Sequence, residues 1–563
     1  MGVEGFVDWR GKPVDKARHG GHRAASFMYF MQAMTSVANV PNLLALVTYL
    51  HSVMHMAIDT TSTTMTNFFG ATCAFALLGG FLSDSYITRF KTILIFGPLE
   101  ILGYGLLALQ ARLPSLRPQP CVTGKPNCTP VQGLDSVLLY ASLYTIALGE
   151  GGLRANLASF GGDQYDDEDP VESRQKSSFF NWFTFSLSIG AFLGLILIVW
   201  VEDNTGWPAG FALSAFFILV GLSVVVCGFP LYRNQCPGGS PLTRMLQVFV
   251  AAFKKRKLPP PEDETELHHD QVKVDKLGGE ILPHTNSFRF LDKAAICHGN
   301  YTDSWSLCTV TQVEETKIVL RMVPIFISTC FNYIPIPLLL TLTVQQGGTM
   351  NTNLGNLRIS PATLLIIPVT FQTVILVAYD RVFLPLARKL TGYKTGITHL
   401  QRIGIGFVAS FIATSVAGAI ERKRKSVAEE KGLVESSAGL PMSMFWLGLQ
   451  FFFLGIIDAS TFVGLLEFFN TEFSRGMKSL ATAVFWCILG LSSFMGSVVV
   501  NVANDATKGH ERGGWLEGNN LNRDHLDRFY WLLSVIGFLG FLNYLYWAKR
   551  YVYRQNLLIE DSG

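Results

Sequence analysis

The sequence predicts an all-α membrane protein with twelve transmembrane helices in two six-helix bundles, and two observations lead to this fold class. First, 49% of the 563 residues are hydrophobic and only 15% are charged, whereas an average soluble domain has about 25% charged residues. Second, the apolar runs follow one another as six, a long polar interval, and six more. Each run reaches the ~20 residues that an α-helix needs to cross a bilayer.

The expected helices define the domains. Those of the first half cover residues 24–50, 66–87, 92–112, 134–156, 179–201 and 209–231. Those of the second half cover 316–343, 361–384, 400–420, 441–468, 479–503 and 529–549. The division is then an N-terminal tail 1–23, a first bundle 24–231, a cytoplasmic linker 232–315, a second bundle 316–549 and a C-terminal tail 550–563. Because apolar residues are sparse in the linker, we expect it to be solvated and mostly disordered, with one short helix near 241–253.

The distribution of basic residues predicts that both termini are cytoplasmic. Lys and Arg are enriched in short cytoplasmic loops, and the loops that contain Arg89, Arg174 and Arg388 fall on the side of the termini. The basic run 422–425 falls on the opposite side and conflicts with this orientation. The orientation is decided by the basic residues of all short loops together. We therefore keep cytoplasmic termini as the prediction in spite of this one loop.

Composition and motifs argue against several kinds of protein. The net charge of +3 gives no basis for nucleic-acid binding. The sequence has no P-loop, HExxH or GxSxG motif, so we expect neither an enzyme nor a cofactor. The nine cysteines form no CxxC pair and no Cys/His ligand spacing, so we expect no metal site.

The loop after the third expected helix contains Cys121 and Cys128. On the non-cytoplasmic side these cysteines can form a disulfide or remain free thiols, and the sequence leaves both open. Asn127 begins an Asn-Cys-Thr sequence that matches the N-glycosylation motif.

Two ionisable residues, Glu150 and Arg154, lie at the end of the apolar run 134–156. Charged groups at membrane depth are costly, and they usually face a water-filled pathway or pair with each other. Long charged side chains also mark the membrane surface and extend into it. The residues alone leave both interpretations open.

Five stretches resemble signatures of one family, and they are residues 75–92, 179–190, 310–317, 379–406 and 525–531. On these motifs the chain is identified as a member of the plant nitrate and peptide transporter family, within the proton-dependent oligopeptide transporters of the major facilitator superfamily. The resemblance spans nearly the whole chain. It implies the major facilitator fold, in which two bundles move around a substrate site near the middle of the membrane.

The resemblance also implies roles for three residues between the second and third helices. Asp84, Arg89 and Lys91 match the signature that joins these helices, and we expect them to form a gating motif.

A charged pair across the central cavity is the second implication. Arg154 stands where the family has a lysine linked to coupling and substrate binding, and Glu467 matches the family's glutamate in helix 10. In relatives these positions can pair, so we expect Arg154 to face Glu467, with Glu150 as a neighbour. A guanidinium stays protonated and holds a carboxylate through two hydrogen bonds, which favours anchoring an anion over donating a proton.

The first helix departs from the family pattern. Gln32, Thr35 and Ser36 occupy the positions of the family's charged proton-coupling motif, and none of the three carries a charge. Either Glu467 or Glu150 then carries proton coupling alone, or the protein is a facilitator driven by the gradient of its substrate.

The expected substrate is an organic anion such as a plant hormone of the abscisic acid or gibberellin type, because the chain looks most similar to the hormone-transporting subgroup. Nitrate-transporting relatives have a histidine where Ile336 stands here, which argues against nitrate. Alternatives are a proton symporter for nitrate or peptides, and a transporter-derived sensor with little transport. Besides the charged residues, the expected lining is Asn332, Tyr333, Gln372 and Trp486, although helix packing also explains each of them. The expected partners are the lipid bilayer, the anion and protons, in the plasma membrane rather than the vacuolar membrane.

Overall fold

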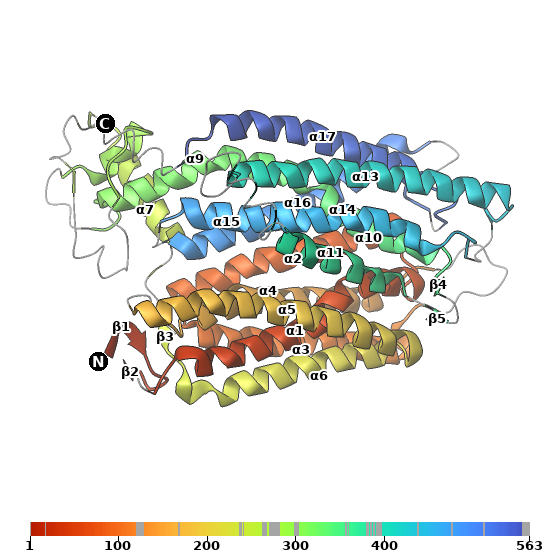
Figure 1. Ribbon diagram of the computed structural model, residues 1–563, viewed down its shortest axis with the longest axis horizontal. Coiled ribbons are helices and arrows are strands. Elements are labelled where there is room, and N and C mark those ends of the chain that lie inside the picture. The colour runs from red at the N-terminus through yellow and green to blue at the C-terminus, as the bar shows by residue number, and fades with distance from the viewer. Residues whose placement is uncertain are drawn as a thin grey trace.

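Two helical bundles make up the structure, a computed structural model (Figure 1). It describes residues 2–16, 18–119, 129–166, 169–235, 239, 241–259, 261, 267–268, 282–297, 303–354, 357–358, 360–378, 382, 386, 389, 397–435, 439–474, 477–509, 513–518 and 520–553. The first bundle consists of α1 (Gly21–Ser52), α2 (Ile58–Ser85), α3 (Arg89–Arg112), α4 (Leu134–Gly162), α5 (Pro170–Asn204) and α6 (Trp207–Cys227). The second consists of α9 (Val310–Tyr333), α10 (Pro335–Gly348), α11 (Ile366–Ala378), α13 (His399–Glu430), α14 (Gly448–Ile457), α15 (Val463–Glu472), α16 (Lys478–Thr507) and α17 (Leu526–Arg550).

The helices confirm the all-α membrane fold. Eleven segments of the described chain are long and apolar enough to cross a membrane. One of them combines α9 and α10, and another combines α14 and α15 with the π-helical segment Asp458–Phe462 between them. α11 covers only part of the expected helix 361–384, and much of the remainder lies outside the described residues.

The short elements mark the two ends of the bundles. β1 (Gly2–Val7) pairs antiparallel with β2 (Pro13–Asp15) and with β3 (Asn234–Gln235), and β4 (Asn353–Leu354) pairs with β5 (Leu357–Arg358). Figure 1 shows β1–β3 and α7 (Pro241–Lys254) at one end, here called the linker end, and β4 and β5 at the opposite, far end.

Apolar side chains on the outer surface fit a lipid environment. Along α17 the exposed residues Trp531, Val535, Phe538, Leu539 and Leu542 recur at helical spacing on one face. In water such a continuous apolar stripe would be unfavourable, whereas in a bilayer it faces lipid tails. The opposite face of α17 packs on α13 and α9.

The hydrophobic pattern did not predict the part of the interface between the bundles that lies toward the far end. α2 begins at Ile58 and not at the expected residue 66. The predicted start was too late because the first turns of α2 are rich in Ser and Thr and do not read as an apolar run. These hydroxyls bond back to the helix, as Thr66 does to the Ser62 carbonyl at 2.9 Å. Residues 58–67 of α2, here called the α2 seam, also join the second bundle: Ser62 meets Thr341 at 3.1 Å and Thr66 meets Ser497 at 2.6 Å.

The expectation of a mostly disordered linker is wrong for its described parts. Besides α7, a helical segment Arg289–Ala295 packs with the start of α9 around an apolar cluster that includes Val248, Leu291 and Val313. Lys255, in the middle of a basic run, is buried, and its ammonium donates to the carbonyls of Ala294 at 3.2 Å and Ile296 at 2.8 Å. Sparse apolar residues were therefore enough to dock the linker, because they gather on one surface.

The dissenting basic run 422–425 is part of α13, which extends past the expected residue 420 to Glu430. Arg424 is fully buried and pairs with Glu421 at 2.7 Å, while the Lys425 ammonium donates to the Asp524 carbonyl at 2.6 Å. Lys423 lies 3.7 Å from the centre of the Trp446 ring. Three of the four basic residues in the run thus have partners within the protein, and this reduces the weight of the run against the expected orientation.

Asp524 makes the stability of this far end depend on pH. Loss of hydration raises the pKa of its carboxyl to about 7, and the nearby Lys425 opposes the shift only in part. A raised pKa in the folded state stabilises the protein at acidic pH, and this contribution is lost as the pH rises from about 4 to about 7. Asp524→Asn should remove that decline, which is worth roughly 2–4 kcal/mol, from the unfolding midpoint measured against pH. Asp527→Asn, which removes the half-buried acid paired with Lys425 at 3.4 Å, should leave the decline in place.

Candidate functional site

Close helix packing positions the charged end of α4. A Cβ atom on Gly149 would collide with the backbone of Glu100 in α3, and one on Gly151 would collide with the Thr72 carbonyl in α2. One on Gly152 would collide with the Phe96 ring. Glycine at these positions lets α2 and α3 approach α4 directly. The Gly-Glu-Gly-Gly sequence thereby fixes the direction in which Glu150 and Arg154 project.

Arg154 does not face Glu467 in this structure, so the expected cross-bundle pair is corrected. The guanidinium of Arg154 binds the Glu150 carboxylate one turn earlier on α4. On its other side it lies 4.8 Å from the centre of the Trp486 ring on α16, a cation–π contact between the two bundles. The side chain of Arg154 is 29% exposed and that of Glu150 is 10% exposed.

Glu467 is held within the second bundle. Its carboxylate accepts a 2.7 Å hydrogen bond from Arg402 of α13 and lies 3.6 Å from His399. Arg402 also donates to the carbonyl of Ala459, at 2.9 Å, in the π-helical segment. π-helical turns leave carbonyls without their usual helical partner and occur often at functional sites. The Glu467 side chain is 46% exposed, which is unusual for an acid within a membrane span.

The other expected lining residues have different surroundings. Asn332 is 1% exposed and packs against Gly540 of α17, so it lies in a helix interface and not in the lining. Tyr333 is buried beside the break between α9 and α10 and within electrostatic range of Asp458. Gln372 is half-buried on α11, where its backbone packs against α14. Trp486 is the member of this set that contacts Arg154.

The neutral residues of α1 bond among themselves. Gln32 donates to Ser36 at 3.0 Å, and Thr35 donates to the carbonyl of Met31 at 3.1 Å. One turn later, Asn39 donates to Glu100 of α3 at 2.7 Å, a contact that the sequence did not suggest. A glutamate inside the apolar run 92–112 was nevertheless a visible signal, because ionisable residues in membrane spans are usually functional.

Two residues of the expected gating motif, Asp84 and Arg89, are part of an ion-pair network. Arg89 binds Asp163 at 2.5 Å and Asp84 at 3.3 Å, and it donates to Gln235 of β3 at 3.0 Å. Lys91 is exposed. The network joins α2, α3 and α4 at the linker end. Cys121, Asn127 and Cys128 lie outside the described residues.

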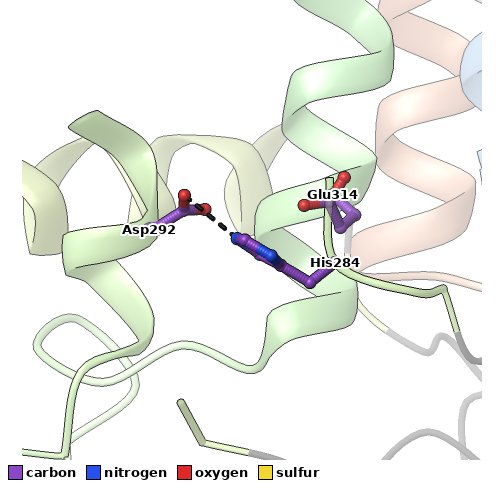
Figure 2. A group of neighbouring side chains, drawn as sticks. All are labelled: His284, Asp292 and Glu314. Atoms are coloured by element: carbon purple, nitrogen blue, oxygen red, sulfur yellow. Dashed lines mark ion pairs between the residues drawn. The ribbon is translucent and has the colours of Figure 1, made fainter. Parts of the chain in front are cut away.

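A second polar cluster lies where the linker docks on α9. Figure 2 shows His284 and Asp292 directed toward each other beside Glu314, with His284 and Asp292 3.1 Å apart. Their ligand atoms lie within 4.8 Å of one another, close enough to hold a metal ion. The ammonium of Lys317, which is fully buried, already lies 2.7 Å from both Asp292 and Glu314. Lys317 therefore supplies the positive charge that a metal ion would bring.

Removing Lys317 should undock the linker. Lys317→Ala leaves two buried carboxylates facing each other, so we expect a loss of about 3–5 kcal/mol in stability, seen as a lower unfolding midpoint. A chelator should leave the midpoint of the unaltered protein unchanged. A lower midpoint in chelator would instead show that a metal ion holds the cluster together.

Comparisons with known proteins agree with this architecture. The family model PTR2, described as the POT family, matches residues 90–516. "Protein NRT1/ PTR FAMILY 4.6" and "Protein NRT1/ PTR FAMILY 4.5" of Arabidopsis thaliana are each 41% identical to the chain, covering 98% of it and 97% of the relative.

Solved structures share the fold. The crystal structure of an auto inhibited POT family peptide transporter matches with a TM-score of 0.66 at 18% identity, covering 94% of this chain and 98% of that one. The POT family transporter PepTSo matches with a TM-score of 0.65 at 16% identity, over the same shares. The chain therefore belongs to the POT family, in the branch that includes the Arabidopsis thaliana NRT1/PTR FAMILY proteins, and it is a membrane transporter, not an enzyme.

Proposed function

We propose that this transporter carries an organic anion by alternating access, with Arg154 binding the negative charge of the substrate. The observation that carries the proposal is the position of Arg154 between the bundles. It projects from α4 to the Trp486 ring on α16, so a group bound there touches both halves of the protein. A partly exposed guanidinium beside an aromatic ring suits a carboxylate attached to an apolar body.

The surroundings favour an organic acid over nitrate. Phe462 and Phe485 pack around Trp486, with ring centres 6.3 and 5.2 Å away. Ile336 is buried and apolar at the position where nitrate-transporting relatives have histidine. Nitrate is small and needs several polar partners, whereas a hormone such as abscisic acid or a gibberellin can use one cation and apolar faces. Nitrate and peptide transport remain the alternatives.

The contacts between the bundles support an open linker end. Hydrogen bonds join the bundles along the α2 seam, and the backbone of Asp59 also donates to Leu516 at 3.2 Å. Toward the linker end, by contrast, Arg154 and Glu467 keep 29% and 46% of their side-chain surface exposed. A transporter closed at the far end and accessible from the linker end is in one of its two alternating states.

A substrate screen tests the proposed function. The purified protein is reconstituted in liposomes, and uptake of abscisic acid, a gibberellin, nitrate and a dipeptide is measured with and without an imposed pH gradient. Uptake of an organic acid above that of empty liposomes is the expected result. Uptake of nitrate or the dipeptide alone would overturn the substrate assignment, and binding without flux of any compound would favour a sensor.

The plasma membrane is the proposed location. Microscopy of a fluorescent fusion beside markers of the plasma and vacuolar membranes tests it, and a vacuolar signal would overturn it.

A further inference from the structure

Glu100 is a fully buried acid that no described basic residue contacts through a hydrogen bond or ion pair. It lies in the middle of α3, and one of its carboxylate oxygens, Oε1, accepts a hydrogen bond from the Asn39 amide at 2.7 Å. The Tyr104 hydroxyl donates to the other side of the same amide at 2.9 Å, which fixes its orientation. The second oxygen of Glu100, Oε2, has no hydrogen-bond partner in the described structure. A single neutral donor does not compensate a carboxylate in a low-dielectric interior.

The charged groups around Glu100 do not balance. Glu150 and Arg154 of α4 both act on Glu100 electrostatically. Gly149, the residue before Glu150, lies directly against the Glu100 backbone. α1 contributes the neutral Asn39, and α6 has no charged residue. If both acids were ionised, one cation would face two anions. The net charge of −1 would be buried, and the desolvation cost of such a charge is several kcal/mol.

Two further titratable groups belong to these surroundings. Cys73 of α2 lies within electrostatic range of Arg154 and Glu150. Glu202 of α5 is within range of Tyr104 but packs against Gly210 of α6. Neither group brings a positive charge. Among these groups, Arg154 is therefore the one cation near Glu100 and Glu150.

We propose that Glu100, which lies on α3 beside the Glu150 segment of α4, carries a proton and is the proton-binding site of the transporter. Glu100 stands in place of the charged motif that is absent from α1. Part of the inference rests on the proposed function, namely the step that links the proton to the substrate. When an anion occupies Arg154, the positive charge beside Glu100 is neutralised, and Glu100 holds its proton more tightly. Anion and proton binding then strengthen each other, as a symporter requires.

The exposure of the three side chains orders the route of the proton. Arg154 is 29% exposed, Glu150 is 10% exposed and Glu100 is fully buried. A proton from the aqueous side therefore reaches Glu150 first and Glu100 after it. Because Glu150 also contacts Arg154, substrate binding controls the outer of these two acids.

Infrared difference spectroscopy tests the proton site without knowledge of the substrate. The purified protein in lipid is titrated with acid and base, and the C=O stretching band of protonated carboxylic acids is followed. Glu100→Gln keeps the size of the side chain and the bond from Asn39, and it should abolish part of this band. Arg154→Gln should extend the band to more alkaline pH, because Glu100 then lacks the nearby cation and holds its proton more tightly. An unchanged band in Glu100→Gln would overturn the proposal.

Glu202→Gln is the matched control. Glu202 is 3% exposed and its two carboxylate oxygens have no hydrogen-bond partner in the described structure, but it does not contact Arg154. In a protein that carries both Arg154→Gln and Glu202→Gln, the contribution of Glu202 to the band should disappear while the extension to alkaline pH persists. Loss of that extension would contradict the assignment to Glu100.

Transport then tests coupling separately. In liposomes, Glu100→Gln should lose the stimulation of uptake by a pH gradient and keep exchange of substrate across the membrane. Stimulation equal to that of the unaltered protein would overturn the coupling role. If no substrate moves in the unaltered protein, the proposed function fails, while the infrared result still decides the proton site.

Discussion

Arg154→Ala is expected to reduce uptake of an organic anion nearly to the level of empty liposomes at substrate concentrations below the KM of the unaltered protein, while the protein still reaches the membrane and stays monodisperse. The substitution removes the cation that lies between Glu150 and the Trp486 ring. A hydrogen bond to a charged group contributes about 1.5–3 kcal/mol, so the apparent affinity should fall by about tenfold or more. Uptake of radiolabelled substrate at several concentrations measures the change.

Two variants make the result specific. Arg154→Lys keeps the charge but loses the two-pronged grip on a carboxylate, so transport should persist with weaker affinity. Arg422→Gln removes an exposed basic residue at the far end of α13, and it should transport like the unaltered protein. Full uptake by Arg154→Ala would show that the substrate's charge binds elsewhere.

The fold was predictable because membrane helices leave a strong signal in the sequence. Apolar runs of bilayer length and the polar interval between them give the two bundles directly. The start of α2 was one of the larger boundary errors. A stretch rich in hydroxyl side chains is typical of a loop, but here Ser62 and Thr66 form hydrogen bonds with the second bundle. A polar helix surface that faces another helix cannot be distinguished from a solvated loop by hydropathy alone.

The individual site residues were easier to predict than their partners. Arg154 and Trp486 are in contact, but the predicted Arg154–Glu467 pair does not form in this structure. Which side chains meet across the bundles depends on the relative position of two rigid bodies, and one sequence encodes at least two such positions. The Glu150–Arg154 contact needed no tertiary information, because residues four apart lie on the same face of a helix.

Buried charges were the second kind of omission. Glu100 lies in a segment identified by its hydropathy, and Lys317 lies in a segment identified by its resemblance to a family signature. The importance of each charge depends on the residues that surround it in the fold. Lys317 is balanced by two carboxylates, whereas among the described residues Glu100 has only the Asn39 amide as a hydrogen-bond donor. The sequence shows that a charge is present, but only the packing shows whether it is compensated.

A disulfide across the α2 seam should stop transport reversibly. The hydroxyl oxygens of Thr66 and Ser497 are 2.6 Å apart, on α2 and α16. Cysteines at both positions are therefore expected to bond under oxidising conditions with little movement of the helices. A closed seam prevents the far end from opening, so the alternating cycle cannot proceed and net uptake should fall at least about tenfold. Adding a reducing agent should restore uptake.

The controls separate locking from damage. Thr66→Cys and Ser497→Cys alone should keep transport under the same oxidation, which also accounts for the native cysteines. A second pair, Ser62→Cys with Thr341→Cys, tests the same seam at an independent contact of 3.1 Å. In the locked protein, a cysteine at the half-exposed position of Glu467 should still react with a water-soluble reagent from the linker end. Transport that continues in the cross-linked protein would mean that the bundles do not separate at α2.

Because the hydroxyls in this seam bond to both their own helix and the opposite bundle, separation can exchange these bonds for water at low cost. A polar seam is therefore suited to the repeated opening and closing that alternating access requires.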